Sequence, residues 1–313
     1  MSKVACVGIL VADVMTKPVD EVPAKGLLSQ VDAIELYSGG NAMTAAVNMR
    51  KMGVDSAIVG KVGDDMFGRF LEEKMADMGV NTKGLKKDDK TQTSVSVVLS
   101  ASDGERTFLH CVGTNGTFSI DDVDWDVIAE ADYVFVTGTY LMNTFDGQQT
   151  ADFLKKCQDM GKTTLLDVCW DAKDRWASVL DCAMPYIDIF MPSIDEAVKI
   201  SGETEPEKIA DVFFAKGVKK VVIKLGKKGA YLRESVDAGS VIVPTYSKIK
   251  AVDTTGAGDS FCSGFITGLV KGLSFEECGL FANAVGTHCV MEKGATTGIK
   301  SYEEIRKFME EYE

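Results

Sequence analysis

The stretch Asp253-Thr254-Thr255-Gly256-Ala257-Gly258-Asp259-Ser260-Phe261 sets small residues directly before a carboxylate that opens an apolar segment. Gly256 and Gly258 permit backbone torsions that a side chain would penalise, and they leave their N–H groups open to an anion. A helix that begins here adds unsatisfied amides and partial positive charge, so the pattern predicts an anion site formed by Gly256, Ala257 and Gly258. Asp259 is then placed to take a proton from a hydroxyl while these amides hold a transferring phosphoryl group. The alternative is that Asp259 only caps the helix and the glycines only form a turn.

Charge and composition exclude several classes of protein. The 313 residues carry a formal net charge of −13, which argues against nucleic acid or an anionic membrane as a partner. Two histidines leave little material for a zinc site or a Ser-His-Asp triad. The eight cysteines form no Cys-x-x-Cys pair, so free thiols in a reducing compartment are expected. With no signal-peptide pattern before Val4 and no apolar run long enough for a membrane span, we expect a cytoplasmic protein.

Apolar runs alternate with helical patterns over most of the chain. This alternation predicts an α/β fold with a doubly wound, mostly parallel sheet in a single domain, residues 1–313. The expected strands are Val4–Leu10, Asp55–Gly60, Tyr133–Thr137, Thr163–Val168, Ile187–Met191 and Lys220–Lys224, and the expected helices are Ala42–Met52, Phe67–Met78, Gln148–Met160, Glu196–Ser201, Pro206–Lys216 and Ser260–Lys271. Capping-box spacing marks three helix starts, at Ser193, Ser274 and Ser301.

Two regions break this rhythm. Residues 12–38 lack a helical pattern and end in the alternating run Val31–Tyr37, and residues 91–112 contain a hairpin signal around Ser102-Asp103-Gly104-Glu105. We expect the two regions to form one small antiparallel β sheet that covers the site as a lid. Because unpaired strand edges invite partners, the lid also predicts a homodimer. Arg106 and His110 on the second region are candidates for substrate contact or for a paired surface role.

A second glycine motif, Ser38-Gly39-Gly40-Asn41-Ala42, leads into the first expected helix. Its position after the first lid region makes substrate contact by Gly39, Gly40 and Asn41 plausible, with a turn and helix cap as the alternative. Asn41 offers a donor and an acceptor to a sugar hydroxyl, and Asp13, just past the first strand, offers an acceptor. Ligands of open α/β sheets bind at such strand ends.

The two glycine motifs, in this order and about two hundred residues apart, resemble the two signatures of the ribokinase-like carbohydrate kinases, also called the PfkB family. Three further segments resemble that family in register: Gly60–Gly68, Val221–Ala230 and Gly294-Ala295-Thr296. The resemblance covers essentially the whole chain. It implies ATP-dependent phosphorylation of a hydroxymethyl group of a sugar. No Gly-x-x-x-x-Gly-Lys-Ser/Thr run is present, so the ATP site is not of the P-loop kind.

The resemblance also implies roles for particular residues. Asp259 becomes the catalytic base and Gly256-Ala257-Gly258 the anion hole, with Asp13, Gly39, Gly40 and Asn41 facing the sugar. Lys224, Gly226 and Gly229 line the nucleotide, and Asn283 lies near the adenine. Glu196 holds Mg²⁺ through water, and Asp253 and Thr255 match positions that hold a monovalent cation, K⁺ for example, in ribokinase itself. Simple packing at the turn explains Asp253 and Thr255 equally well.

Two positions depart from the family pattern. Ser193-Ile194-Asp195-Glu196 replaces Asn-x-x-Glu, and the capping box explains Ser193 and Glu196 as well as a metal does. Thr44 stands where the first signature usually has Asn, which affects sugar specificity rather than the reaction. A nucleoside kinase of the same fold and a non-catalytic sugar-binding sensor remain alternatives to the sugar kinase. The absence of Gly-x-Gly-x-x-Gly after the first strand excludes a dinucleotide oxidoreductase.

Overall fold

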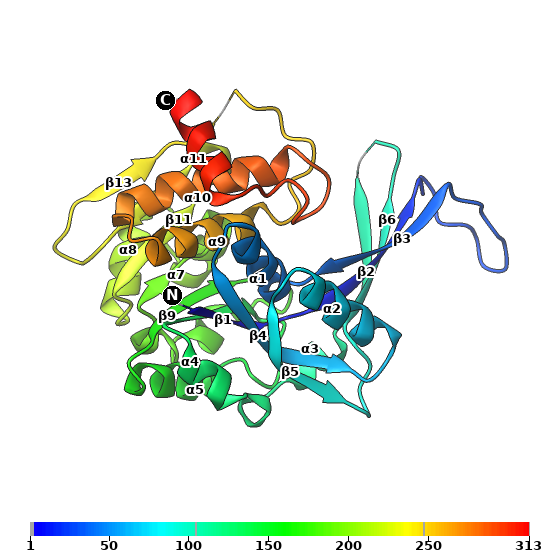
Figure 1. The fold of residues 1–313 in the computed structure, drawn as a ribbon, viewed down its shortest axis with the longest axis horizontal. Coiled ribbons are helices and arrows are strands. Elements are labelled where there is room, and N and C mark those ends of the chain that lie inside the picture. The colour runs from blue at the N-terminus through cyan, green and yellow to red at the C-terminus, as the bar shows by residue number, and fades with distance from the viewer. Residues whose placement is uncertain (1–2, 104, 247, 313) are drawn as a thin grey trace.

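A sheet of nine strands forms the centre of the computed structural model, which describes residues 3–103, 105–246 and 248–312 (Figure 1). Seven strands are parallel, and β12 and β13 extend one edge as antiparallel neighbours. In spatial order the strands are β13 (Ser240–Val243), β12 (Ala230–Arg233), β11 (Lys220–Lys224), β10 (Ile189–Phe190), β9 (Thr163–Val168), β8 (Tyr133–Thr139), β1 (Lys3–Gly8), β4 (Asp55–Gly63) and β5 (Asn81–Asp88).

Helices cover both faces of this sheet because its strands are apolar on both sides. In β1, for example, Ala5 and Val7 belong to one buried cluster while Val4 and Cys6 belong to the other. The first face carries α4 (Trp125–Glu130), α5 (Gln148–Asp159), α6 (Ala177–Leu180), α7 (Ile194–Ser201) and α8 (Pro206–Ala215). The second carries α1 (Asn41–Lys51), α2 (Met66–Asp77), α9 (Ala257–Val270) and α10 (Phe275–Val290), with α11 (Tyr302–Glu311) packed outside α10.

The predicted doubly wound fold is confirmed, and the sheet is wider than expected. The strands β5, β12 and β13 were not predicted, because all three lie at or beside an edge and lack a long apolar run; β5, for instance, is rich in lysine. The expected strand Val4–Leu10 ends earlier, at Gly8, and the chain then enters a second strand at Val11. All three predicted capping boxes are present, at Ser193, Ser274 and Ser301.

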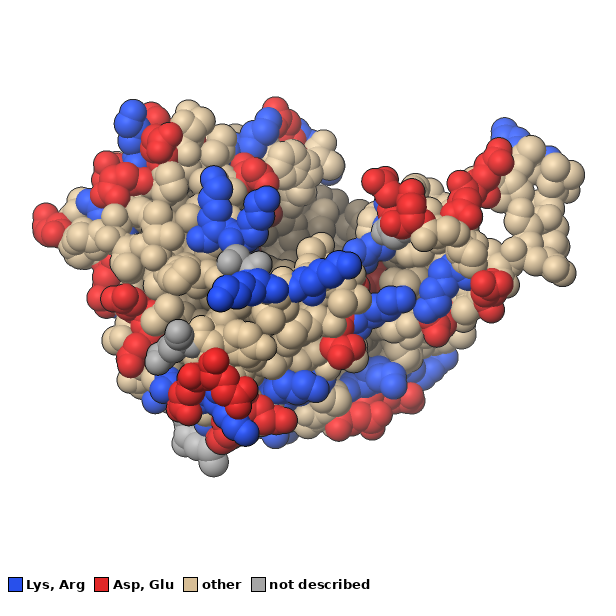
Figure 2. Space-filling model, turned by 90° about the horizontal axis from the view of Figure 1, so that it is seen from above, with Lys and Arg blue, Asp and Glu red and all other residues tan. Residues whose placement is uncertain are grey.

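A second sheet of four strands projects from one end of the large sheet (Figure 1). Its order is β3 (Ala33–Gly39), β2 (Val11–Lys17), β6 (Val95–Ser100) and β7 (Arg106–Cys111). The pairs β2–β3 and β6–β7 are antiparallel, as predicted, and a parallel pairing of β2 with β6 joins them. We call these four strands the small sheet. Gly104, in the predicted hairpin turn, lies outside the described residues. Figure 2 shows a hollow between the bulk of the molecule and this projecting part.

Helix α9 lies unusually close to α10. A Cβ atom built on Gly264 would stand 2.9 Å from Ala282 Cα, so a larger residue there would push the two helices apart. A Cβ atom built on Gly268, one turn further along α9, would stand 3.1 Å from Cα of Cys278 on α10. Among the described residues, no helix combines the length and the apolar character needed to cross a bilayer. All eight cysteines are free; five of them are buried, whereas Cys111 and Cys182 are exposed.

Candidate functional site

The two glycine motifs, far apart in sequence, meet at the N-terminal ends of two helices. Asn41 is the first residue of α1, and Asp259 lies in the first turn of α9. The Nδ2 group of Asn41 donates a hydrogen bond of 2.7 Å to Oδ1 of Asp259. Within the described residues, Oδ2 of Asp259 has no hydrogen-bond partner, so the carboxylate is oriented by Asn41 and keeps one oxygen free. The structure thus brings the predicted sugar-side residue and the predicted base into contact.

Glycine is required at the turn before each helix. Gly40 has a φ of 88°, and a Cβ atom there would lie 2.5 Å from the carbonyl oxygen of Ile9. Gly256 has a φ of 74°, and a Cβ atom there would lie 2.3 Å from Cβ of Ala295. Both positions therefore exclude a side chain by torsion and by space. The N–H groups of Gly256 and Gly258 lie at the open N-terminus of a helix of 14 residues, which is a suitable place for an anion. The N–H group of Ala257 lies there too, but it donates to the carbonyl oxygen of Thr254 at 3.2 Å.

A buried ion pair supplies positive charge beside these amides. Nζ of Lys224, at the end of β11, lies 2.8 Å from Oδ1 of Asp167 on β9, and their side chains are 12% and 2% exposed. A Cβ atom built on Gly258 would stand 3.6 Å from the same Nζ, so the ammonium group borders the predicted anion hole. Burial lowers the pKa of Lys224, but the negative charges of Asp167 and Glu196, the Cys262 thiol and the hydrogen bond to Asp167 together raise it above its ordinary value. Lys224 is therefore a permanent cation at this site.

The charge state of Asp259 follows from its surroundings. Burial raises the pKa of this carboxyl group to about 6, while the positive charge of Lys224 and the hydrogen bond from Asn41 act in the opposite direction. A base works best when its pKa lies near the working pH, because it is then deprotonated and still accepts a proton readily. The environment of Asp259 meets this condition near neutral pH.

Asp13 lies on β2, where the small sheet adjoins the large one. A Cβ atom on Gly39 would stand 2.2 Å from its Oδ2 atom, so a side chain at position 39 would displace this carboxylate. Burial raises the pKa of Asp13 to about 6, opposed by a hydrogen bond with Ser96 on the neighbouring strand β6. The base of the small sheet therefore brings together Asp13, Gly39 and Gly40. The next residue, Asn41, connects this group to Asp259 through its hydrogen bond.

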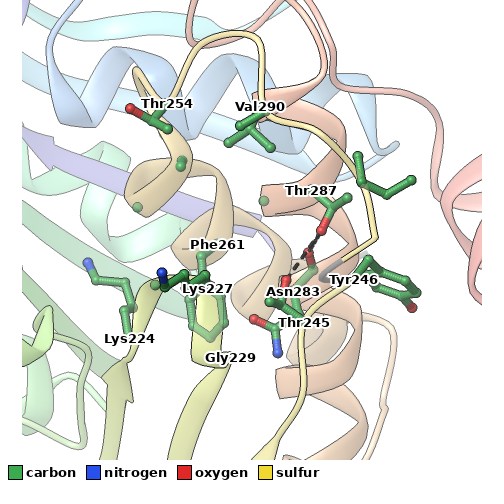
Figure 3. Close-up of a pocket in the computed structure, with 16 residues that line it drawn as sticks. Lys224, Lys227, Gly229, Thr245, Tyr246, Thr254, Phe261, Asn283, Thr287 and Val290 are labelled. Carbon is green, nitrogen blue, oxygen red and sulfur yellow. Dashed lines mark hydrogen bonds between the residues drawn. The ribbon is translucent and has the colours of Figure 1, made fainter.

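A pocket of about 450 Å³ opens on the other side of the α9 N-terminus (Figure 3). Figure 3 shows its residues coming from the turn after β11 and from helices α9 and α10. They include Lys224, Gly226, Gly229, Ala257, Gly258 and Asn283. Asn283 uses its Nδ2 group to donate to the carbonyl oxygens of Val243 and Pro244, at 3.1 and 2.9 Å, and so holds the chain that forms the far wall. All four residues predicted to line the nucleotide are in this pocket.

Glu196 lies in the first turn of α7, within the electrostatic reach of Lys224 and Asp167. Its Oε2 atom accepts a hydrogen bond of 2.8 Å from the Ser193 amide, which completes the predicted capping box. The described residues contain no cluster of three or more metal-ligating side chains. A lone carboxylate fits Mg²⁺ that keeps most of its water, because this ion is often held by one or two carboxylates and by phosphate.

Asp253 and Thr255 do not fit a monovalent cation. Oδ1 of Asp253 accepts hydrogen bonds from the amide and the hydroxyl of Thr255, at 2.9 and 2.7 Å, and Oδ2 accepts from the Gly294 amide at 3.0 Å. The positive charge beside them is Arg106 of the small sheet, whose Nη2 group lies 2.9 Å from Oδ1 of Asp253. The alternative of a packed turn describes these two residues better.

Sequence reasoning missed two residues of the site. Asp167 was placed in a buried strand but was not singled out, although a carboxylate at the end of an otherwise apolar strand is a signal for a paired or functional group. Cys169 follows the same strand, and its thiol donates to Oδ1 of Asn41 at 3.4 Å. No sequence pattern identifies this contact, because it depends on how β9 and α1 meet.

Comparisons with known proteins identify the family of this chain. The family model described as pfkB family carbohydrate kinase matches residues 1–301. The 2-dehydro-3-deoxygluconokinase of Bacillus subtilis is 26% identical over 293 residues, covering 91% of this chain and 90% of that protein. The solved structure of Arabidopsis thaliana ribokinase complexed with ribose and ATP superposes with a TM-score of 0.85 at 26% identity, covering 98% of both chains.

A nucleoside kinase from Methanocaldococcus jannaschii shares the fold, with a TM-score of 0.80 at 22% identity over 99% of both chains. The fold, the paired glycine motifs and the family match over nearly the whole sequence lead to one conclusion. The chain belongs to the pfkB family of carbohydrate kinases, and it is a sugar or nucleoside kinase.

Proposed function

We propose that this protein is an ATP-dependent sugar kinase that phosphorylates a hydroxymethyl group, with Asp259 as the base. The observation that carries this proposal is the hydrogen bond between Asn41 and Asp259, which sets the base between the sugar-side residues and the anion hole. The free Oδ2 atom of Asp259 takes the proton of the hydroxymethyl group. The amides at residues 256–258 and the ammonium group of Lys224 hold the transferring phosphoryl group and its charge.

The pocket of about 450 Å³ supports a nucleotide site next to the anion hole. In this proposal Lys224, Gly226, Gly229 and Asn283 hold ATP, which supplies the phosphoryl group, and Glu196 holds Mg²⁺ through water. The Arabidopsis ribokinase structure contains ATP, and a putative ribokinase II from E. coli, at 23% identity, was solved with ATP and Mg²⁺. Those ligands were bound to those proteins, and the donor set of this chain is compatible with the same ligands.

The small sheet supports a neutral sugar rather than a second anionic substrate. Its four strands contain two Lys or Arg residues, Lys17 and Arg106, and both are engaged with carboxylates, Glu35 and Asp253. A carboxylate or phosphate on the sugar would therefore find no unpaired Lys or Arg on these strands. Asp13 and Asn41 instead offer acceptors and a donor that match sugar hydroxyls.

Asp259→Asn tests the mechanism. Loss of a general base typically lowers the rate by about 10²- to 10⁴-fold, and we expect at least such a loss in kcat, with ATP affinity measured by calorimetry close to that of the wild type. Asp126→Asn is the matched control, because Asp126 is an exposed acid in the first turn of α4. Near wild-type turnover by Asp259→Asn would refute the proposed mechanism, and a wild-type protein that binds a sugar without phosphorylating it would instead indicate a sensor.

A substrate panel tests the sugar assignment. ATP consumption would be measured with ketoses, aldopentoses, sugar acids and nucleosides at equal concentration. We expect the highest kcat/KM with a neutral sugar. Preference for a nucleoside would leave the kinase assignment intact but contradict the proposal that the substrate is a sugar. Preference for a sugar acid would contradict the argument from Lys17 and Arg106 that the substrate is neutral.

The small sheet is proposed to act as the lid of the site and as the surface of a homodimer. Its strands and the connection between β2 and β3 expose large apolar side chains, among them Leu27, Leu28, Ile34, Phe108 and Leu109. Exposed apolar side chains gathered on a sheet mark an interaction surface, and the edges β3 and β7 are unpaired within the described chain. The mass in solution at micromolar concentration should be that of a dimer, and a monomeric mass would contradict this proposal.

A further inference from the structure

Arg106 links the small sheet to the turn that forms the anion hole. It is the first residue of β7, and its guanidinium group contacts residues nearly 150 positions later in the chain. Nη2 donates to Oδ1 of Asp253 at 2.9 Å, and Nη1 donates to the hydroxyl of Thr255. The side chains of Arg106 and Asp253 are 24% and 15% exposed, so the pair is largely removed from water. Thr255 directly precedes Gly256.

Both carboxylate oxygens of Asp253, the hydroxyl of Thr255 and the backbone carbonyl of Thr255 each accept at least one hydrogen bond. Oδ1 of Asp253 accepts from Arg106 and from the amide and hydroxyl of Thr255, and Oδ2 accepts from Gly294. The hydroxyl of Thr255 donates to Asp253 and accepts from Arg106. The backbone carbonyl of Thr255 accepts from the Cys289 thiol at 3.3 Å. These hydrogen-bond donors and the guanidinium charge neutralise and orient the same oxygens, which is the effect that a bound cation would have on them.

We propose that Arg106 is the built-in cation of this turn, so that the kinase works without a monovalent metal ion and its anion hole is coupled to the position of the small sheet. This rests on the proposed function. The guanidinium group remains charged at every working pH, and its two donors fix the direction of Asp253 and Thr255 together. Arg106 is a positioning residue, because it acts on the phosphoryl group through the turn at Gly256 and not by touching it.

The first test needs no variant. Kinase activity and ATP affinity of the wild-type enzyme would be compared in KCl, NaCl and tetramethylammonium chloride at a constant ionic strength of about 0.15 M. We expect kcat/KM for ATP and the calorimetric Kd to agree within about twofold among the three salts. Thermal unfolding should show the same Tm in each, because no ion binds preferentially to the folded state. A drop of tenfold or more in kcat/KM for ATP when K⁺ is absent, or a rise in Tm that only K⁺ produces, would overturn the proposal.

The second test removes the charge. Arg106→Gln leaves Asp253 without its cation and opens space beside it, so kcat/KM for ATP should fall about tenfold in tetramethylammonium chloride. K⁺ should then restore most of the loss, although it does not affect the wild type. Arg106→Lys keeps a positive charge, so its kcat/KM for ATP should fall less than that of Arg106→Gln. Arg69→Gln is the matched control, because Arg69 forms an exposed pair with Asp64 away from the turn.

The outcomes separate this proposal from the kinase assignment. A wild-type enzyme that phosphorylates sugar only with K⁺ would refute the role of Arg106 and leave the sugar kinase intact. Arg106→Gln with wild-type activity in all three salts would also refute it. Loss of activity that neither K⁺ nor Arg106→Lys restores would assign Arg106 to folding or substrate contact, against the proposal. A folded protein without kinase activity in any salt would refute the proposed function itself.

Discussion

Replacing Lys224 by Met should separate stability from catalysis at this site. The wild-type pair, with Nζ and Oδ1 at 2.8 Å, has a Coulomb attraction of about 6 kcal/mol at an effective dielectric constant of about 20. Desolvation of both groups offsets much of this attraction. Removing one partner is nevertheless costly, because Asp167 would keep a charge while only 2% exposed. We therefore expect Lys224→Met to lower the free energy of unfolding by about 3–5 kcal/mol.

The loss should depend on pH in a defined direction. Burial already raises the pKa of Asp167, and without Lys224 it rises further. A carboxyl group whose pKa is higher in the folded than in the unfolded state favours folding at low pH, and this contribution is lost as the pH rises through the folded value. Lys224→Met should therefore be closer to the wild type at pH 5 than at pH 8 when both are unfolded in urea.

A double variant provides the control. Lys224→Met with Asp167→Asn removes both charges, so most of the lost stability should return, leaving a deficit below about 2 kcal/mol. Activity should not return, because the cation beside Gly258 is still missing. If the single variant unfolded at the same urea concentration as the wild type at pH 8, or if the double variant were less stable than the single one, this account of the pair would be wrong.

Three further predictions follow from other residues. The pH profile of kcat/KM should rise through an inflection near 6 as Asp259 loses its proton, and an acid limb that stays flat down to pH 5 would contradict the base assignment. Gly39→Ala should displace the Asp13 carboxylate and raise KM for the sugar at least about tenfold, with little effect on KM for ATP. An equal rise in the two KM values would contradict the placement of Asp13 on the sugar side. Ser274→Ala should cost about 1 kcal/mol in urea unfolding with unchanged turnover, since it removes only the cap of α10.

Local patterns in the sequence were sufficient to predict the central fold and the two glycine turns that precede α1 and α9. The strands β9 and β11 have the predicted bounds, and the capping boxes mark the starts of α7, α10 and α11. Glycines before Asn41 and Asp259 indicated two exposed helix starts, because few other residues allow the torsions found there. Such features are encoded within a few residues of one another, and so the sequence alone reveals them.

Long-range pairings were not predictable in the same way. The parallel contact between β2 and β6 joins segments separated by β3, α1, β4, α2 and β5, and no pattern in either strand identifies the other as its partner. Lys224 was assigned to the nucleotide from the family resemblance, but its partner Asp167 becomes visible only when β9 and β11 are placed in one sheet. Arg106 likewise had two open interpretations until the structure placed it against Asp253.

The contact between Asn41 and Asp259 also bears on how the enzyme is made in the cell. The two residues are 218 positions apart, and the turn at Gly256 rests on Ala295, which follows it in the sequence. A growing polypeptide therefore contains Asn41 long before it contains Asp259, and the turn at Gly256 is braced only after Ala295 has been added. Chains released before Asp259 lack the proposed base, so on the proposed mechanism kinase activity reports that synthesis has passed this residue.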